Sequence, residues 1–363
     1  MSGSHRRARW RSWWVFGLTA VLGLGLLAAP AYASPSTLSL DLFPEAPEAP
    51  EAPPLDPAAM VAQVGPALVN IDTKMGYQSA VGAGTGIVLN PDGQVLTNNH
   101  VIEGATSITA TDIGNGQTYD VDVIGYDRNQ DVALLQLRGA GGLPTANLGD
   151  SSTVAVGDPI VAMGNAEGAN GTPSAVPGTV VALNQTISAA DSLTGSSETL
   201  SGMIQANAPI RPGDSGGPMV NSGGQVIGMN TAASGNFKFF SHGGQGFAIP
   251  INRARAIAGQ IQSGNASGTV HIGPTAFLGV GVSSQGGNGA KVVRVLPDAP
   301  AAQVGITADD VITSVDGQPV DSATALTNIL DRHHPGDTVS LGWHGPLTGE
   351  HTANVTLAAG PPG

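Results

Sequence analysis

The chain has 363 residues, 41% of them hydrophobic, which is enough for two or three domains with cores of their own. Its formal net charge of −13 argues against nucleic acid or an anionic membrane surface as a partner, since both are recognised by basic surfaces. The absence of cysteine excludes disulfide bonds, a thiol nucleophile and cysteine-based zinc sites.

The first 33 residues have the three parts of an export signal: the cationic "HRRARWR", the apolar "VFGLTAVLGLGLLAA" and the small-residue cleavage motif "AYA". We expect a signal peptide over residues 1–33, cut after Ala33, and therefore a secreted or cell-envelope protein. The apolar run is shorter than the ~20 residues of a spanning helix, so no stable membrane anchor is expected after cleavage. An uncleaved anchor and a twin-arginine export route stay open. Loss of the four leader arginines lowers the net charge from −13 to −17.

Residues 34–57 contain "PEAPEAPEAPPLDP", whose prolines and like charges predict an extended tether. Over residues 58–263, short β-rich runs such as "ALVNIDT", "QVLTNN", "DVALLQL" and "QVIGMNT" alternate with glycine-rich turns, which predicts an all-β barrel or sandwich domain. The run "INRARAIAGQIQ" at 251–262 has apolar residues at helical spacing and closes this domain.

A second domain is predicted after a linker at 264–275. Residues 276–358 offer the strands "FLGVGVSS", "AKVVRVL", "VITSVDG" and "DTVSLGW", with helices over "DAPAAQVG" and "SATALTNILDRHH". This pattern is typical of a small α+β domain.

Three separated residues form a candidate nucleophile, base and orienting acid. His100 ends the apolar run of "VLTNNHVIEG", Asp131 directly precedes the apolar run of "DVALLQL", and Ser215 lies in "RPGDSGGPMV". A serine hydroxyl needs an adjacent base to become a nucleophile. The chain order His, Asp, Ser separates this set from α/β-hydrolases and subtilisins.

The glycines around Ser215 allow a sharp turn, so that the backbone amides of Gly213 and Ser215 can point at one spot and form an oxyanion hole. Another glycine-rich run, "GAGTGIV" at 82–88, lacks the helix and the acid of a dinucleotide site and is better explained as a strand. The histidines show no metal-ligand spacing, and we expect neither a metal nor a cofactor.

The blocks "TNNHV", "QDVALLQL" and "GDSGGP" resemble the catalytic blocks of chymotrypsin-fold (trypsin-like) serine proteases, in the bacterial HtrA/Deg version with a C-terminal PDZ domain. The resemblance covers about residues 58–358. It implies two six-stranded β-barrels, a protease domain at 58–263 and a PDZ domain at 276–358. It also implies peptide-bond hydrolysis of unfolded or flexible polypeptides, with His100 as base then acid, Asp131 as orienting acid and Ser215 as nucleophile.

The resemblance further implies two binding pockets. The S1 pocket, which receives the substrate side chain before the cut bond, would have uncharged walls and prefer small or medium aliphatic groups. These walls are Ile210, Thr231, Ala232 and Ala233. In the second domain "FLGV" resembles the loop with which PDZ domains bind a peptide C-terminus. That loop comprises Phe277, Leu278, Gly279 and Val280.

Asp214 departs from most HtrA relatives, which have asparagine at this position, and its counter-charge is not evident from the sequence. The sequence does not settle whether the chain forms a homo-oligomer. Two other functions stay open: a latent protease that acts as a chaperone or peptide-binding protein, and an esterase.

Overall fold

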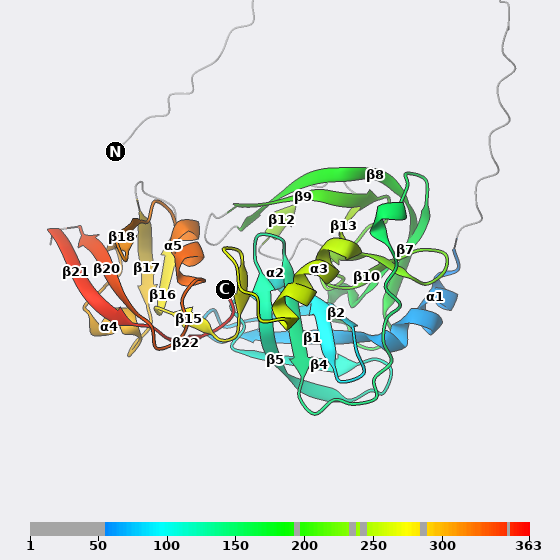
Figure 1. The fold of residues 1–363 in the computed structure, drawn as a ribbon, viewed down its shortest axis with the longest axis horizontal. Helices are drawn as coiled ribbons and strands as arrows, with labels where there is room; N and C mark the ends of the chain where they lie inside the picture. The colour runs from blue at the N-terminus through cyan, green and yellow to red at the C-terminus, as the bar shows by residue number, and fades with distance from the viewer. Residues whose placement is uncertain (1–54, 192–196, 232–236, 240–244, 284–288, 347–348) are drawn as a thin grey trace, which may run out of the picture. The chain divides into compact units, whose positions relative to one another are not determined.

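The structure is a computed structural model that describes residues 55–191, 197–231, 237–239, 245–283, 289–346 and 349–363 (Figure 1). The expected signal peptide and nearly all of the expected tether lie outside these ranges. All the described residues fall in one compact unit. Within the described ranges, no helix combines the length and the apolar character needed to cross a membrane.

The first barrel has six strands in the order β5-β4-β1-β2-β3-β6, and pairing of β5 with β6 closes it. A further strand, β14 (Val270–Ile272), lies within the expected linker and pairs with β5. Helices α1 (Pro57–Val64) and η1 (Gly65–Ala67) precede the barrel, and α2 (Asn99–Ile102) follows β3. The six strands are β1 (Leu68–Met75), β2 (Ala80–Val88), β3 (Gln94–Thr97), β4 (Ser107–Asp112), β5 (Thr118–Asp127) and β6 (Val132–Leu137).

The turn between β2 and β3 shows how local sequence sets this barrel. The Asn90 side chain accepts hydrogen bonds from the backbone N–H groups of Asp92 and Gln94, both at 3.1 Å, and Gly93 takes the positive φ of 86° that the turn requires. The chain therefore reverses at "NPDG", and Ile87 pairs with Leu96 across the hairpin.

The second barrel has the strand order β8-β7-β10-β11-β13-β9 and is closed by pairing of β8 with β9. A short strand, β12 (Phe237–Phe239), pairs with β8. Two 3-10 helices, η2 (Ser151–Thr153) and η3 (Ala166–Gly168), flank β7. The barrel strands are β7 (Pro159–Gly164), β8 (Ser174–Asp191), β9 (Ser197–Ala206), β10 (Pro218–Val220), β11 (Val226–Thr231) and β13 (Gly246–Pro250).

Helix α3 (Ile251–Gln262) spans the residues predicted for it and contacts strands of both barrels (Figure 1). One apolar cluster joins the outer faces of the barrels beneath this helix and includes Leu96, Met163 and Ile257. Two further clusters fill the barrel interiors. Burial of this apolar surface is the main force that holds the barrels together.

The C-terminal residues form a separate core around Ile312, Leu326 and Trp343. Its sheet has the order β16-β17-β18-β20-β21, with β19 (Gln318–Pro319) paired to β18, and β15 (Thr275–Phe277) pairs with β22 (Ala358–Gly360). The helices are α4 (Pro300–Gln303) and α5 (Ala323–Leu330). The sheet strands are β16 (Val280–Ser283), β17 (Ala290–Val295), β18 (Val311–Val315), β20 (Thr338–Gly345) and β21 (Gly349–Thr356). The expected double six-stranded barrel followed by a small α+β domain is confirmed.

Candidate active site

Three elements bring the predicted triad together. His100 lies in α2, just after strand β3 of the first barrel, and Asp131 lies in the turn between β5 and β6. Ser215 belongs to the second barrel, in the loop before β10. The site therefore joins segments 115 residues apart in sequence and exists only when the two barrels are packed against each other.

The three side chains form one continuous hydrogen-bonded chain. His100 Nδ1 lies 2.9 Å from Asp131 Oδ2, and His100 Nε2 lies 2.9 Å from Ser215 Oγ. An ionised carboxylate only accepts hydrogen bonds, so Nδ1 carries the hydrogen and Nε2 presents a lone pair to the serine hydroxyl. This tautomer is the one that can take a proton from Ser215.

The carboxylate of Asp131 is held by further donors. It accepts the backbone N–H of His100 at 3.0 Å and the hydroxyl of Thr231 at 3.0 Å. Asp131 itself has a left-handed backbone with a φ of 54°, and the buried side chain of Asn98 donates to its carbonyl oxygen at 2.9 Å. Aspartate is one of the few residues that adopt this conformation readily. The donors orient the carboxylate toward the histidine.

A nearby aspartate at the end of β5, Asp127, faces away from His100. Its side chain accepts hydrogen bonds from the Gln130 N–H at 3.1 Å and from the Thr269 hydroxyl at 3.0 Å. Burial raises its pKa. The structure thus brings Asp131, and not Asp127, to His100.

The segment before Ser215 has the hydrogen bond and the positive-φ glycine that characterise a type II β-turn. The N–H of Asp214 donates to the carbonyl of Arg211 at 3.0 Å, and Gly213 takes a φ of 95°. A Cβ on Gly213 would lie 2.0 Å from the Asn165 carbonyl oxygen, so only glycine fits here. Proline at the preceding position has its backbone already fixed for such a turn.

Carbonyl groups around this turn are all anchored. The Pro212 carbonyl accepts the N–H of Glu167 at 2.6 Å, and the Gly213 carbonyl accepts the hydroxyl of Thr85 at 2.8 Å. The N–H of Thr85 donates to the Ser215 carbonyl at 2.8 Å. In a trans peptide the N–H points opposite to the C=O. The Gly213 N–H therefore points away from Glu167.

The residues expected to line the S1 pocket are described in part. Ile210 packs against β13, where a Cβ on Gly246 would lie 2.5 Å from its Cδ1 atom. Thr231 is buried at the end of β11 and directs its hydroxyl to Asp131. Ala232 and Ala233 lie outside the described residues.

The "FLGV" loop enters strand β16, which lies at the edge of its sheet. The carbonyls of Leu278 and Gly279 accept hydrogen bonds from Ala301 and Leu296, at 3.0 and 2.9 Å. The N–H groups of Gly279 and Val280 consequently point the other way. Leu278 is buried in the domain core, and the ring of Phe277 stacks on Tyr77 with centroids 5.4 Å apart.

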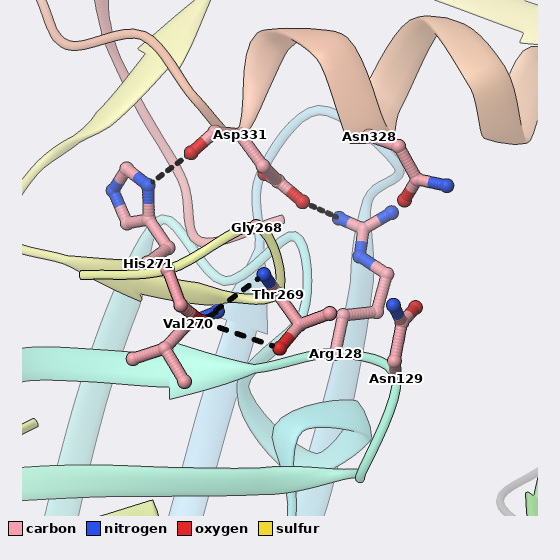
Figure 2. Close-up of a pocket in the computed structure, with 9 residues that line it drawn as sticks. Arg128, Asn129, Gly268, Thr269, Val270, His271, Asn328 and Asp331 are labelled. Carbon is pink, nitrogen blue, oxygen red and sulfur yellow. Dashed lines mark hydrogen bonds and ion pairs between the residues drawn. The ribbon is translucent and has the colours of Figure 1, made fainter. Parts of the chain in front are cut away.

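A small polar pocket lies apart from the triad, between the end of α5 and strand β14 (Figure 2). Asp331 is its centre: the carboxylate lies 3.6 Å from Arg128 and accepts the Tyr126 hydroxyl at 3.0 Å, while its carbonyl oxygen lies 2.7 Å from His271 Nδ1. The pocket volume of about 10 Å³ has room for roughly one water molecule. It is too small for a peptide substrate.

Several contributors to the site carry no motif of their own. Asn98 stands within the block that contains His100, but Thr85 lies in a glycine-rich strand and Glu167 holds the Pro212 carbonyl through its backbone N–H. A backbone N–H donor cannot be recognised from the sequence, because every residue except proline has one. Thr85 could have been suspected only from its place among glycines that admit close approach of another segment.

Comparison with known proteins gives the same domain order. Residues 84–229 match the family model of the trypsin-like peptidase domain, and residues 276–344 match that of the PDZ domain. The fold and the site define a trypsin-like serine protease domain joined to a PDZ domain.

Three curated relatives match most of this chain. The serine protease PepD of Mycobacterium tuberculosis is 36% identical over 316 residues, which cover 82% of this chain and 65% of PepD. The putative serine protease HhoA of Synechocystis is 31% identical over 76% of this chain and 77% of its own length. The periplasmic serine endoprotease DegP of Escherichia coli is 34% identical over 73% of this chain and 55% of DegP. The chain belongs to the HtrA-type serine proteases that carry a PDZ domain, and it spans less than two thirds of PepD and DegP.

Proposed function

We propose that this chain is an exported serine endopeptidase that cuts peptide bonds with Ser215, His100 and Asp131. The observation that carries the proposal is the continuous hydrogen-bonded chain from Asp131 through His100 to Ser215, with both links at 2.9 Å. The names of the relatives, serine protease and serine endoprotease, support the same activity.

In the proposed reaction the Ser215 hydroxyl attacks the peptide carbonyl carbon while His100 Nε2 takes its proton. The resulting imidazolium is stabilised by the Asp131 carboxylate. The C–N bond then breaks as His100 gives that proton to the leaving amine, which leaves an acyl group on Ser215. Water, activated by His100 in the same way, hydrolyses the ester and restores the enzyme.

The negative oxygen formed during attack needs donors that are already in place. We assign this role to the backbone N–H groups of Gly213 and Ser215. Support comes from the anchored carbonyls of Pro212 and Gly213, which hold the turn in one orientation. Each such donor is worth about 2.7–4 kcal/mol of transition-state stabilisation.

The substrate side chain before the cut bond is assigned to a pocket walled by Ile210, Thr231, Ala232 and Ala233. By resemblance to the family, Pro209 occupies the place of the carboxylate that trypsin-like enzymes use to bind Lys or Arg. A cationic group would lose its hydration there without gaining a partner. Aliphatic side chains are the expected ligands.

The PDZ domain is assigned to the binding of peptide C-termini. Two successive amides, of Gly279 and Val280, point away from the carbonyls held by the domain, and β16 is an edge strand that a peptide can extend. This assignment makes unfolded or flexible polypeptides with a free C-terminus the expected partners.

The domain limits follow the same proposal: signal peptide 1–33, tether 34–57, protease domain 58–263, linker 264–275 and PDZ domain 276–358. Export is supported by the description of the DegP relative as periplasmic.

Hydrolysis of an unfolded protein by the mature chain tests the proposal, with Ser215→Ala as the control. We expect cleavage that the Ser215→Ala protein lacks and covalent labelling of Ser215 by an active-site phosphonate. Binding of the unfolded protein without cleavage or labelling would indicate the latent, chaperone-like alternative. Turnover of esters but not amides would indicate an esterase.

A further inference from the structure

Asp214, the residue before the nucleophile, has a buried carboxyl group with few partners. It is 3% exposed and packs against Gly164 at the end of β7. Its Oδ2 accepts the N–H of Arg211 at 2.9 Å, and its Oδ1 lies 2.7 Å from the hydroxyl oxygen of Ser174. These contacts fix both ends of the turn that precedes Ser215.

The hydrogens in this cluster can be counted. Ser174 Oγ lies 2.7 Å from Asp214 Oδ1 and also 3.0 Å from the Gly164 carbonyl oxygen. The two oxygens would both be acceptors if Asp214 were ionised, yet a serine hydroxyl has a single hydrogen to donate. An additional hydrogen on Asp214 satisfies all three atoms at once.

The charges around Asp214 agree with this count. None of the ion pairs formed by the described residues includes Asp214, and the Arg211 guanidinium lies 3.5 Å from Glu167 on the surface. Burial raises the pKa of Asp214; the Arg211 N–H, the Ser174 hydroxyl and the Arg211 charge lower it, while the Glu167 charge acts with burial.

We propose that Asp214 is a neutral carboxylic acid in the active protein. In this form it positions the turn that carries the Gly213 and Ser215 amides, through a relay of two hydrogen bonds. Oδ1–H donates to Ser174 Oγ, the Ser174 hydroxyl donates to the Gly164 carbonyl, and Oδ2 accepts the Arg211 N–H. Asp214 is a positioning residue, because it acts on Gly213 and Ser215 through the backbone. The role in catalysis rests on the proposed peptidase function, whereas the protonation state does not.

Loss of this proton changes the relay. The ionised carboxylate takes the single hydrogen of Ser174, so the Gly164 carbonyl loses its side-chain donor. A buried unpaired charge is also left beside the nucleophile. The turn that carries the Gly213 amide is then less firmly held, and the turnover number falls on the alkaline side. Asparagine reproduces the neutral pattern, with an NH₂ donor in place of Oδ1–H, and cannot ionise.

Isotope-edited infrared spectroscopy with labelled aspartate tests the protonation state. The spectrum of the wild-type protein minus that of Asp214→Asn isolates the carboxyl band of this residue, which is necessary because burial also raises the pKa of Asp127 and Asp112. At the pH of maximal activity we expect the band of a neutral acid. A carboxylate band there overturns the proposal. This measurement does not depend on peptidase activity.

The pH dependence of peptide hydrolysis tests the positioning role. The kcat of the wild type should fall over the same pH range in which the infrared band shows Asp214 to ionise. The kcat of Asp214→Asn should not fall over that range and should exceed the wild-type kcat at high pH. The matched control is Asp127→Asn, another buried aspartate, which should keep the wild-type profile. An unchanged alkaline fall in Asp214→Asn overturns the positioning role. Failure of the peptidase proposal would instead appear as a wild-type protein that does not cleave peptides, or as hydrolysis that survives Ser215→Ala, and the infrared result would stand in either case.

Discussion

Asn98 donates a hydrogen bond from its side chain to the backbone carbonyl of Asp131, at 2.9 Å, with both residues buried. The bond holds a residue whose φ of 54° lies in the left-handed region. Because that backbone sets the direction of the Asp131 side chain, Asn98 controls the carboxylate that orients His100 without touching the histidine's nitrogens.

Replacing Asn98 by alanine should therefore lower kcat about fivefold, since a buried hydrogen bond is worth roughly 1 kcal/mol. The loss should disappear in an Asp131→Asn background, where the acid no longer stabilises the imidazolium. Steady-state kinetics of the two single variants and the double variant measure this coupling. Asn70→Ala, which removes another buried asparagine of the first barrel, is the control. If the fold-losses in kcat of the two single variants multiply in the double variant, Asn98 does not act through Asp131 and supports only the fold.

Asp131→Asn should reduce kcat by about 10⁴-fold, the cost of the corresponding change in the serine-protease template, because the amide favours the wrong imidazole tautomer. Asp127→Asn should have little effect, since its carboxyl group contacts Gln130 and Thr269 and not His100. Rates of phosphonate labelling for the two variants measure the difference. A larger loss from Asp127→Asn would show that the orienting acid has been misassigned.

Peptides with a free, apolar C-terminus should bind the PDZ domain, and amidation of that terminus should weaken binding sharply. Gly279→Val should also weaken it, because Gly279 has a φ of 80° and a Cβ there would lie 2.1 Å from the Ala299 Cβ. Gly281→Ala, two residues further on in strand β16 and with no contact under 3.5 Å, is the control. Fluorescence anisotropy on the full chain measures all three. Equal affinity for acid and amide peptides would exclude carboxylate binding.

Cleavage sites in an unfolded protein should be enriched in Ala, Val, Leu or Ile before the cut bond. Each buried methylene contributes about 0.8 kcal/mol, which gives a preference and not strict exclusion among these residues. Mass spectrometry of the products, with the Ser215→Ala protein as a blank, measures the profile. Enrichment of Lys or Arg would contradict the uncharged pocket.

The order of domains and the three residues that the candidate site brings together could be predicted from the sequence because they depend on local patterns. Apolar runs between turn residues predicted most of the strands, and helical spacing predicted α3 over its full range. Among the barrel strands, β5, β9, β10 and β13 were not predicted. Strand β5 alternates exposed and partly buried residues from Thr118 onward and lacks a continuous apolar run. An alternating pattern is the mark of a half-buried strand and was available in the sequence.

The supports of the site could not be predicted, because they are long-range contacts. Thr85 reaches the Gly213 carbonyl across 128 residues, and Ser174 reaches Asp214 across 40. Threonine and serine are common in strands and turns, so residue type alone does not mark them. The buried carboxyl group of Asp214 suggests a cationic partner, whereas the structure places the neutral hydroxyl of Ser174 there.

A buried carboxyl group in the first barrel gives a prediction on stability. Asp112 is fully buried at the end of β4, and its Oδ2 has no partner among the described residues. Burial raises its pKa, although the N–H groups of Asn115 and Gly114 oppose the shift. The folded state thus binds the proton more tightly than the unfolded state. The resulting stability is complete below the ordinary aspartate pKa and is lost as the pH rises through the folded pKa.

Asp112→Asn removes that ionisation, so the stability of the wild type relative to this variant should decline with rising pH, by about 1.4 kcal/mol for each unit of pKa shift. Thermal unfolding from acid to neutral pH, in a Ser215→Ala background that prevents self-digestion, measures the difference. Asp150 offers the opposite case: hydrogen bonds from Ser152 and Asn252 lower its pKa to about 2, so its contribution is lost as the pH falls. For Asp150→Asn the difference from the wild type should therefore change in the reverse direction. Parallel curves for the wild type and Asp112→Asn would show that Asp112 titrates alike in the folded and unfolded chains.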